Sequence, residues 1–245
     1  MKRFYKLVSV EKSDNGFQIL LDGRAVKRKS GSPLNCLNEQ IANRVMTEWA
    51  EQGDDIIPDN MPFTQIENTR LDRVSSEREA MSVNVRKYLN TDLICYTVDA
   101  PKELVELHEQ HWTPWRSWFE KKFGVTLQTT TDLVALKQEN GAHQKVQEYI
   151  ENLDDAYFTI LQIVVPLSGS LVMGLAFIDG TANVDDVFNA AYVEETYKDK
   201  IYDAEKYGHD PLTEKQQKTT LRDLRAAFEY LYFLYAFTLF FYVRQ

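Results

Sequence analysis

The sequence is poor in cysteine. Its 245 residues include two thiols, Cys36 and Cys95. Two thiols are too few for a disulfide framework or a cysteine-rich zinc site, so we expect a reducing compartment. Cys95 stands in the apolar run L-I-C-Y, and we expect it to be a small residue of the core.

Long apolar runs are missing as well. The most hydrophobic segment, residues 231–243, is rich in tyrosine and shorter than the about 20 apolar residues of a membrane-spanning helix. We expect a buried terminal helix or a docking surface there, and no membrane partner. Residues 1–5 lack the apolar stretch of a secretory signal. This favours the bacterial cytoplasm, or the mitochondrial matrix if the chain is a processed eukaryotic form.

Positive charge is the third shortage. Lys and Arg number 28 against 37 Asp and Glu, so the net charge is -9 and the pI is near 5.1. Binding to a phosphate backbone requires Lys and Arg gathered on one face, so we expect no nucleic-acid partner. The one basic cluster, Arg24 with Lys27, Arg28 and Lys29, is interpreted as the solvated face of a hairpin.

Enzyme signatures are also missing, because the sequence has no phosphate-binding loop, dinucleotide fingerprint, G-x-S-x-G elbow or H-E-x-x-H helix. His108 and His111, on either side of Glu109, have a spacing that metal ligands sometimes use. No third ligand follows at a spacing known from metal-binding motifs. We therefore expect no metal and no cofactor, with His111 packed among the tryptophans and His108 facing solvent.

Charged residues after Pro62 allow two interpretations. Asp72 and Arg73, with Glu67 and Arg70, would be an acid–base set if they lined a cleft. Ion pairs between residues three or four apart on one helix also account for these charged side chains, without a catalytic role. We favour that interpretation.

The pattern of turns and apolar residues predicts an α+β fold. Short strands separated by Asp14-Asn15-Gly16 and Asp22-Gly23 occupy the chain to about residue 37. A helix should begin at the N-cap Asn38, another at Pro62, and a further one at a capping box over residues 76–79. We expect a small β-rich N-terminal domain, residues 1–60, and a larger orthogonal α-helical bundle, residues 61–245.

Helices are predicted through most of the second domain. A segment opening at Pro101 should kink or restart at Pro114 and end at Gly124. Residues 125–128 suggest a brief strand, and the near-continuous apolar run at 170–178 predicts an enclosed central helix. The last two helices are expected at about 185–207 and 213–241.

Aromatic side chains are abundant in two places, around Trp112, Trp115 and Trp118 and again from Phe228 to Tyr235. Such residues at helical spacing usually belong to a core. The final run is aromatic on all sides, so part of it should stay available to a partner.

A series of motifs runs through the chain in order. They are K-R-F-Y-K at 2–6, L-D-G-R at 21–24, E-W-A-E-Q at 48–52, M-P-F-T-Q-I at 61–66, T-R-L-D-R-V at 69–74, Y-L-N-T-D-L-I-C-Y at 88–96, W-T-P-W-R-S-W at 112–118 and G-S-L-V-M at 169–173. In these motifs the chain resembles the ATP synthase mitochondrial F1 complex assembly factor 2 family, in the type found in α-proteobacteria.

The resemblance implies a two-domain assembly chaperone that is not an enzyme. It would hold the unassembled alpha subunit of the ATP synthase catalytic sector, shield its apolar interface and release it to the beta subunit, and be monomeric when free. The resemblance further implies a partner-binding site with paired acids and an aromatic-Gly-x-Asp element. The corresponding residues, with one exposed-aromatic candidate, are Glu194, Glu195, Tyr207, Gly208, Asp210 and Trp115.

The chain departs from the family pattern at some positions. Tyr207 stands where a Trp is common, and Lys27-Arg28-Lys29 replaces the usual Thr-Pro after L-D-G-R. Two alternatives remain open: an enzyme with Asp72, Arg73 and His111 in a cleft between the domains, and a general peptide-binding module that uses a sheet edge.

Overall fold

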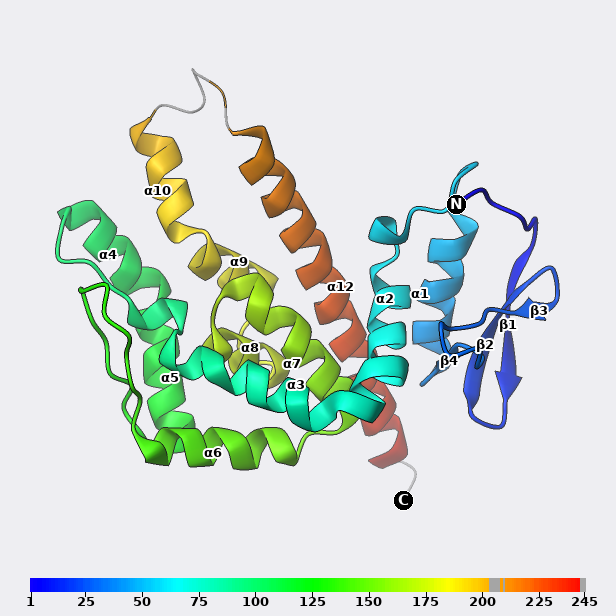
Figure 1. Cartoon of the computed structure of the whole chain (residues 1–245), viewed down its shortest axis with the longest axis horizontal. Helices are drawn as coiled ribbons and strands as arrows, with labels where there is room; N and C mark the ends of the chain where they lie inside the picture. The colour runs from blue at the N-terminus through cyan, green and yellow to red at the C-terminus, as the bar shows by residue number, and fades with distance from the viewer. Residues whose placement is uncertain (203–207, 209, 243–245) are drawn as a thin grey trace. The chain divides into compact units, whose positions relative to one another are not determined.

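The computed structural model describes residues 1–202, 208 and 210–242, and for 236–242 it describes the helical backbone alone. The contacts divide the chain into two compact units. Unit 1 combines residues 1–78 with 226–245, and unit 2 is residues 79–225. Figure 1 shows the elements of both. The units differ in extent from the expected domains 1–60 and 61–245, and that division stays a prediction.

Unit 1 contains a small antiparallel sheet of β1 (Val8–Ser13), β2 (Gly16–Leu21), β3 (Arg24–Ala25) and β4 (Asn35–Cys36). β2 pairs with the other three strands, and Val8 lies opposite Leu21. The predicted turns are confirmed: Asp22 and Gly23 have φ of 48° and 77°, as a two-residue hairpin requires. At Gly16, φ is 120° and a Cβ would lie 2.3 Å from the Cys36 carbonyl oxygen.

Helix α1 (Glu39–Ala50) packs on β1 and β2. Its predicted N-cap is confirmed, because the Asn38 side chain accepts a hydrogen bond of 2.9 Å from the Ile41 N–H. Ile41, Ala42 and Val45 face the core of the unit and are fully buried. After a 3-10 turn, η1 (Pro58–Asn60), the chain enters α2 (Pro62–Asn68) with proline at the predicted first position.

The expected new helix start at residues 76–79 is wrong. α2 passes through a π-helical segment, η2 (Thr69–Val74), directly into α3 (Ser75–Lys87). The Ser76 hydroxyl donates to the carbonyl oxygens of Asp72 and Arg73, one turn earlier, instead of accepting from a downstream N–H. The continuous helix has already satisfied the N–H groups that a capping box would serve.

Buried carboxylates hold α1 and α2 together in unit 1. Glu48 of α1 accepts hydrogen bonds from the N–H groups of Phe63 and Thr64 and from the Thr64 hydroxyl. A side chain of one helix therefore caps the start of the next one, where four N–H groups lack helical partners. Burial raises the pKa of Glu48 to about 7, against the lowering effect of these hydrogen bonds.

A second buried carboxylate is a hub for the C-terminal helix. Glu67 is fully buried and accepts hydrogen bonds of 2.6 Å from Arg70 and from the Tyr230 hydroxyl. Arg70 also donates to the Asn35 carbonyl oxygen. Tyr230 lies on α12 (Pro211–Tyr242), whose residues from 226 onward belong to this unit. The Glu67–Arg70 pair, three residues apart, is of the kind that the sequence analysis favoured over an acid–base set, whereas Asp72 pairs with Arg28 outside the helix.

Unit 2 is mostly helical, with its longest irregular segment at residues 124–139. After the 3-10 turns η3 (Tyr88–Asn90) and η4 (Leu93–Cys95) it contains α4 (Lys102–His111), α5 (Thr113–Phe123), α6 (Asn140–Glu151), α7 (Asp155–Ser168), α8 (Leu171–Ile178), α9 (Val184–Ala191), α10 (Val193–Ile201) and the first part of α12. The predicted starts at Pro101 and Pro114 and the stop at Gly124 are confirmed.

Helix α8 is the centre of unit 2, as predicted. All eight of its residues are buried, and it packs on α5, α7 and α9. Gly174 allows the close approach of α7, because a Cβ at this position would lie 2.5 Å from a methyl carbon of Val165. The start of α8 is capped from two directions: the Ser170 hydroxyl accepts from Met173 N–H, and the buried Asp92 accepts from Val172 N–H.

Three further expectations are corrected in unit 2. Residues 125–128 form no strand, and the nearest β pairing is a single bridge between Tyr96 and Thr130. The helix expected at 185–207 breaks at Tyr192 into α9 and α10, and its residues 203–207 lie outside the described part. The histidines are exchanged: His108 is buried at 2% exposure, whereas His111 is partly exposed.

The predicted fold class is confirmed, since a small antiparallel sheet precedes a mostly helical region. Both thiols are buried. Within the described residues, no helix combines the length and the apolar character needed to cross a membrane.

Candidate functional site

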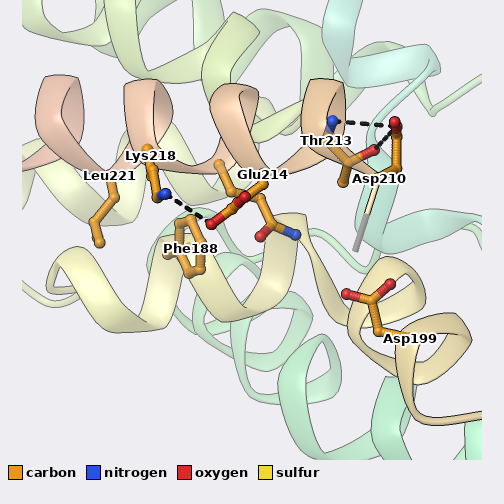
Figure 2. Close-up of a pocket in the computed structure, with 8 residues that line it drawn as sticks. Phe188, Asp199, Asp210, Thr213, Glu214, Lys218 and Leu221 are labelled. Carbon is orange, nitrogen blue, oxygen red and sulfur yellow. Dashed lines mark hydrogen bonds and ion pairs between the residues drawn. The ribbon is translucent and has the colours of Figure 1, made fainter. Parts of the chain in front are cut away.

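A hollow of about 340 Å³ lies in unit 2 among α9, α10 and the start of α12, and Figure 2 shows its side chains. It contains the described residue Asp210, which the sequence analysis had singled out. The lining residues are Phe188, Asp199, Asp210, Thr213, Glu214, Gln217, Lys218 and Leu221. Phe188 and Leu221 supply an apolar wall, and the other members are polar or charged.

Asp210 is fixed at the first turn of α12. Its carboxylate accepts hydrogen bonds from the N–H groups of Leu212 and Thr213 and from the Thr213 hydroxyl, at 3.3, 3.2 and 2.8 Å. The Thr213 hydroxyl, followed by these N–H groups, lowers the pKa of Asp210. The carboxylate is therefore ionised at neutral pH and held in one orientation at the solvent-exposed rim (Figure 2).

The charge of the hollow is negative. It contains three carboxylates, Asp199, Asp210 and Glu214, against one ammonium group, Lys218, which leaves a formal charge of about -2. Lys218 pairs with Glu214 at 2.7 Å on the surface of the same helix. An apolar wall beside carboxylates suits a lysine or arginine side chain, which has an aliphatic stem and a cationic end.

The paired acids lie in the first turn of α10. Glu195 and Asp199 are four residues apart and share a face of the helix. Glu194 lies on a different face, where its carboxylate is 3.5 Å from His108 Nε2 of α4. Both glutamate side chains are partly exposed.

His108 supports this corner of the unit as a neutral ring. It stacks on Trp112 with ring centroids 3.7 Å apart, and Trp112 donates a buried hydrogen bond of 2.9 Å to the Ala190 carbonyl oxygen. Burial, and then the charge of Arg116, lowers the pKa of His108 to about 4. The ring is therefore uncharged at neutral pH, although the Glu194 carboxylate lies 3.5 Å away.

The remaining predicted residues are not gathered at the hollow. Trp115 is half-buried on α5, and Gly208 is exposed with φ of 93°. Tyr207 lies outside the described residues. Of the predicted set, Asp210 lines the hollow. Glu195 does not line it, but shares a face of α10 with Asp199, which does.

Sequence reasoning missed Phe188, Asp199 and Glu214. Asp199 could have been found from its spacing, because it follows Glu195 by one helical turn. Phe188 and Glu214 belong to other helices and come together through packing, for which no local pattern exists.

Residues that the enzyme alternative invoked have structural partners or lie elsewhere. Asp72 pairs with Arg28, and Arg73 lies 3.6 Å from Glu77. Both belong to unit 1, whereas His111 belongs to unit 2. Burial raises the pKa of both cysteine thiols, which keeps them protonated. Among the described residues, no three His, Cys, Asp or Glu side chains are placed to hold a metal ion.

A sheet unit, a helical unit and an exposed acidic hollow with an apolar wall define an α+β protein suited to binding another protein. Comparison with known proteins then identifies the group. The family model of the ATP12 chaperone protein matches residues 2–120. The mitochondrial protein atp12 of Schizosaccharomyces pombe is 23% identical over 209 residues, which are 80% of this chain and 72% of that protein.

Solved structures agree over nearly the whole chain. Atp12 from Paracoccus denitrificans has a TM-score of 0.82 at 27% identity, covering 94% of this chain and 97% of that one. The Atu1473 protein from Agrobacterium tumefaciens has a TM-score of 0.83 at 26% identity, covering 94% and 85%. The chain is therefore similar to the ATP12 chaperones of ATP synthase assembly, by a family model over residues 2–120 and by fold over nearly its whole length.

Proposed function

We propose that this chain binds the unassembled alpha subunit of the ATP synthase catalytic sector, covers its apolar interface and releases it to the beta subunit. The observation that carries the proposal is the acidic hollow at the start of α12, in a chain similar to the ATP12 chaperones. The compartment we propose is the bacterial cytoplasm, or the mitochondrial matrix for a processed form.

The physical need for such a chaperone is simple. A subunit that is buried against a neighbour in the finished complex exposes an apolar face before assembly, and such faces aggregate at cellular concentrations. A chaperone must cover that face and then leave it. Its interface should therefore combine apolar contact with charged groups that orient the client and permit exchange.

The surface next to the hollow offers both components. Ile201 and Tyr202 at the end of α10 are 55% and 73% exposed, and Leu212 at the start of α12 is 77% exposed. These side chains provide apolar area beside the ionised Asp210. We infer that the apolar side chains contact the client, while Glu194, Glu195 and Asp210 orient its basic groups.

The first test is co-expression of the chain with the alpha subunit of the same organism, with and without the beta subunit. Affinity capture followed by size-exclusion chromatography should give a one-to-one complex with alpha that is lost when beta is present. Equal solubility of alpha with and without this chain, and no complex, would contradict the proposal.

The acidic site is tested with the double variant E195K/D210N, in which the new asparagine side chain keeps an N-cap oxygen at the start of α12. We expect the association rate with alpha to fall about tenfold and to lose most of its salt dependence, because steering by charge acts on the encounter. The control D14K/D132N makes the same charge changes at exposed sites elsewhere. If both variants bind alpha as the parent chain does, the acids have no part in recognition.

A further inference from the structure

The basic cluster at residues 24–29, interpreted from sequence as a solvated hairpin face, borders a groove in unit 1. Two hollows of about 610 and 600 Å³ share Met1, Val26, Lys27 and Trp49 in their walls. The first extends along β3, and the second extends between the β3–β4 segment and helices α2 and η2. The two hollows adjoin at these four residues, and we call the pair the Trp49 groove.

The floor and one end of the Trp49 groove are apolar. Trp49, Ile56 and Met61 line it, and the last two belong to the small core cluster of the unit. At the end beside β3, Phe4 is 66% exposed and Met1 is 73% exposed. An exposed aromatic ring over an apolar floor is typical of surfaces that receive a large apolar side chain of a partner.

The rim of the groove is positive in an otherwise acidic chain. The lining residues include five cations, Arg24, Lys27, Arg28, Lys29 and Arg73, and two carboxylates, Asp22 and Asp72, a formal charge of about +3. The whole chain has a net charge of -9. Asp72 is already paired with Arg28. Within the described parts of the chain, Arg24, Lys27 and Lys29 have no ion-pair partner.

One polar atom beside the groove is unpaired within the described part of the chain. The Trp49 indole nitrogen is buried and has no hydrogen-bond partner among the described residues. A buried donor of this kind costs stability unless an acceptor reaches it.

We propose that the Trp49 groove binds an acidic peptide segment of a partner protein, with a large apolar side chain on the floor and carboxylates against Lys27 and Lys29. The net charge of the whole chain disfavours a long polyanion such as nucleic acid, whereas a short acidic segment needs few cations. The groove lies in unit 1 and the acidic hollow lies in unit 2, so the inference holds whether or not the partner is the alpha subunit.

The test is fluorescence anisotropy at low ionic strength with short fluorescein-labelled peptides and the intact chain. One peptide combines Asp and Glu residues with a central Phe-Leu pair, a second replaces the pair by Ser-Ser, and a third replaces the acids by Lys. We expect the first to bind at least about tenfold more tightly than the other two, since each lacks one of the required contacts. A single-stranded oligonucleotide is the fourth probe.

Charge reversal locates the site. K27E/K29E should weaken the first peptide about tenfold, and K121E/K145E, which makes the same change at exposed positions of unit 2, should leave its affinity unchanged. W49F should weaken binding a few-fold through the smaller apolar floor, with thermal unfolding measured to confirm that the fold persists.

Several results would overturn the inference. These are failure of the first peptide to bind, equal weakening by both charge reversals, and oligonucleotide binding as tight as that of the peptide, which would indicate a general anion surface. Sedimentation that shows self-association lost in K27E/K29E would make a second copy of the chain the occupant and overturn it too.

Discussion

The two units solve the same packing problem with different chemistry. Unit 1 places fully or nearly fully buried carboxylates, Glu48 and Glu67, between its helices and satisfies them with N–H and O–H donors. Unit 2 has one such carboxylate, Asp92 at the start of α8, but its centre is α8 itself, whose residues are all buried and mostly apolar. A small unit with limited apolar area gains a specific geometry from directional bonds, whereas a larger one can depend on close packing.

The difference extends to the surfaces. The groove of unit 1 has a positive rim, and the hollow of unit 2 has a negative one. Both have apolar walls. The comparison predicts that unit 1 is sensitive to the loss of single polar groups and unit 2 to changes of volume.

The largest effect is expected at Glu67. Replacing it by alanine leaves Arg70 and the Tyr230 hydroxyl without their buried acceptor, and we expect a loss of about 3–5 kcal/mol in the free energy of unfolding. Chemical denaturation followed by circular dichroism measures it. The control E77A removes the exposed partner of Arg73 and should cost less than about 1 kcal/mol. Equal effects would show that burial of the charge is unimportant.

A volume change should be the sensitive probe of unit 2. In Gly174→Ala the new methyl group would lie 2.5 Å from a Val165 methyl carbon, and we expect a cost of about 1–3 kcal/mol. The control Gly141→Ala, in α6, meets nothing closer than 4.0 Å and should stabilise by about 0.5 kcal/mol. Thermal unfolding of both variants shows whether each change stabilises or destabilises the fold. Stabilisation by Gly174→Ala would contradict the view that unit 2 depends on close packing.

The smallest effect tests the buried ring of His108. Its pKa is lowered in the folded state, so the unfolded chain binds the proton first as the pH falls below about 6.5, and stability decreases toward pH 4. Between pH 6.5 and 5.5, the free energy of unfolding of the parent should fall by on the order of 1 kcal/mol relative to that of His108→Phe. Glu48 and Asp92 have pKa values raised to about 7 and about 6, so they change the free energy of unfolding with pH in the opposite direction. Their contribution is the same in both proteins and cancels in the difference between the parent and His108→Phe.

Parallel denaturation of His108→Phe and the parent at both pH values measures this difference. A constant difference across the range would mean that His108 keeps an ordinary pKa and that its ring is charged beside Glu194.

Local chemistry made much of the fold predictable. Asn38, Pro62, Pro114 and Gly124 act on the backbone within a turn, so the sequence places the corresponding helix ends correctly. The capping box at Ser76 failed because a helix that was already continuous removed the need for it. The roles of Glu48 and Asp92 as caps of other helices could not be predicted, since their partners lie far away in sequence.

The candidate site was predictable to a smaller extent. Asp210 was indicated by a motif, and its carboxylate does line the hollow. Phe188 and Lys218 arrive there from α9 and α12 through tertiary packing. The reversed exposure of His108 and His111 has the same origin, because the choice between two faces of α4 depends on where Trp112 packs.

The split composition of unit 1 has a consequence for synthesis on the ribosome. Its residues 1–78 are translated first, but residues 226–245 follow only after all of unit 2. Until then Glu67 and Asn38 lack the Tyr230 hydroxyl and the Phe233 carbonyl. The acidic hollow, in contrast, draws its residues from a continuous stretch. The nascent chain therefore completes the contacts of its N-terminal strands and helices last, and a truncation before residue 226 would leave a buried carboxylate without one of its donors.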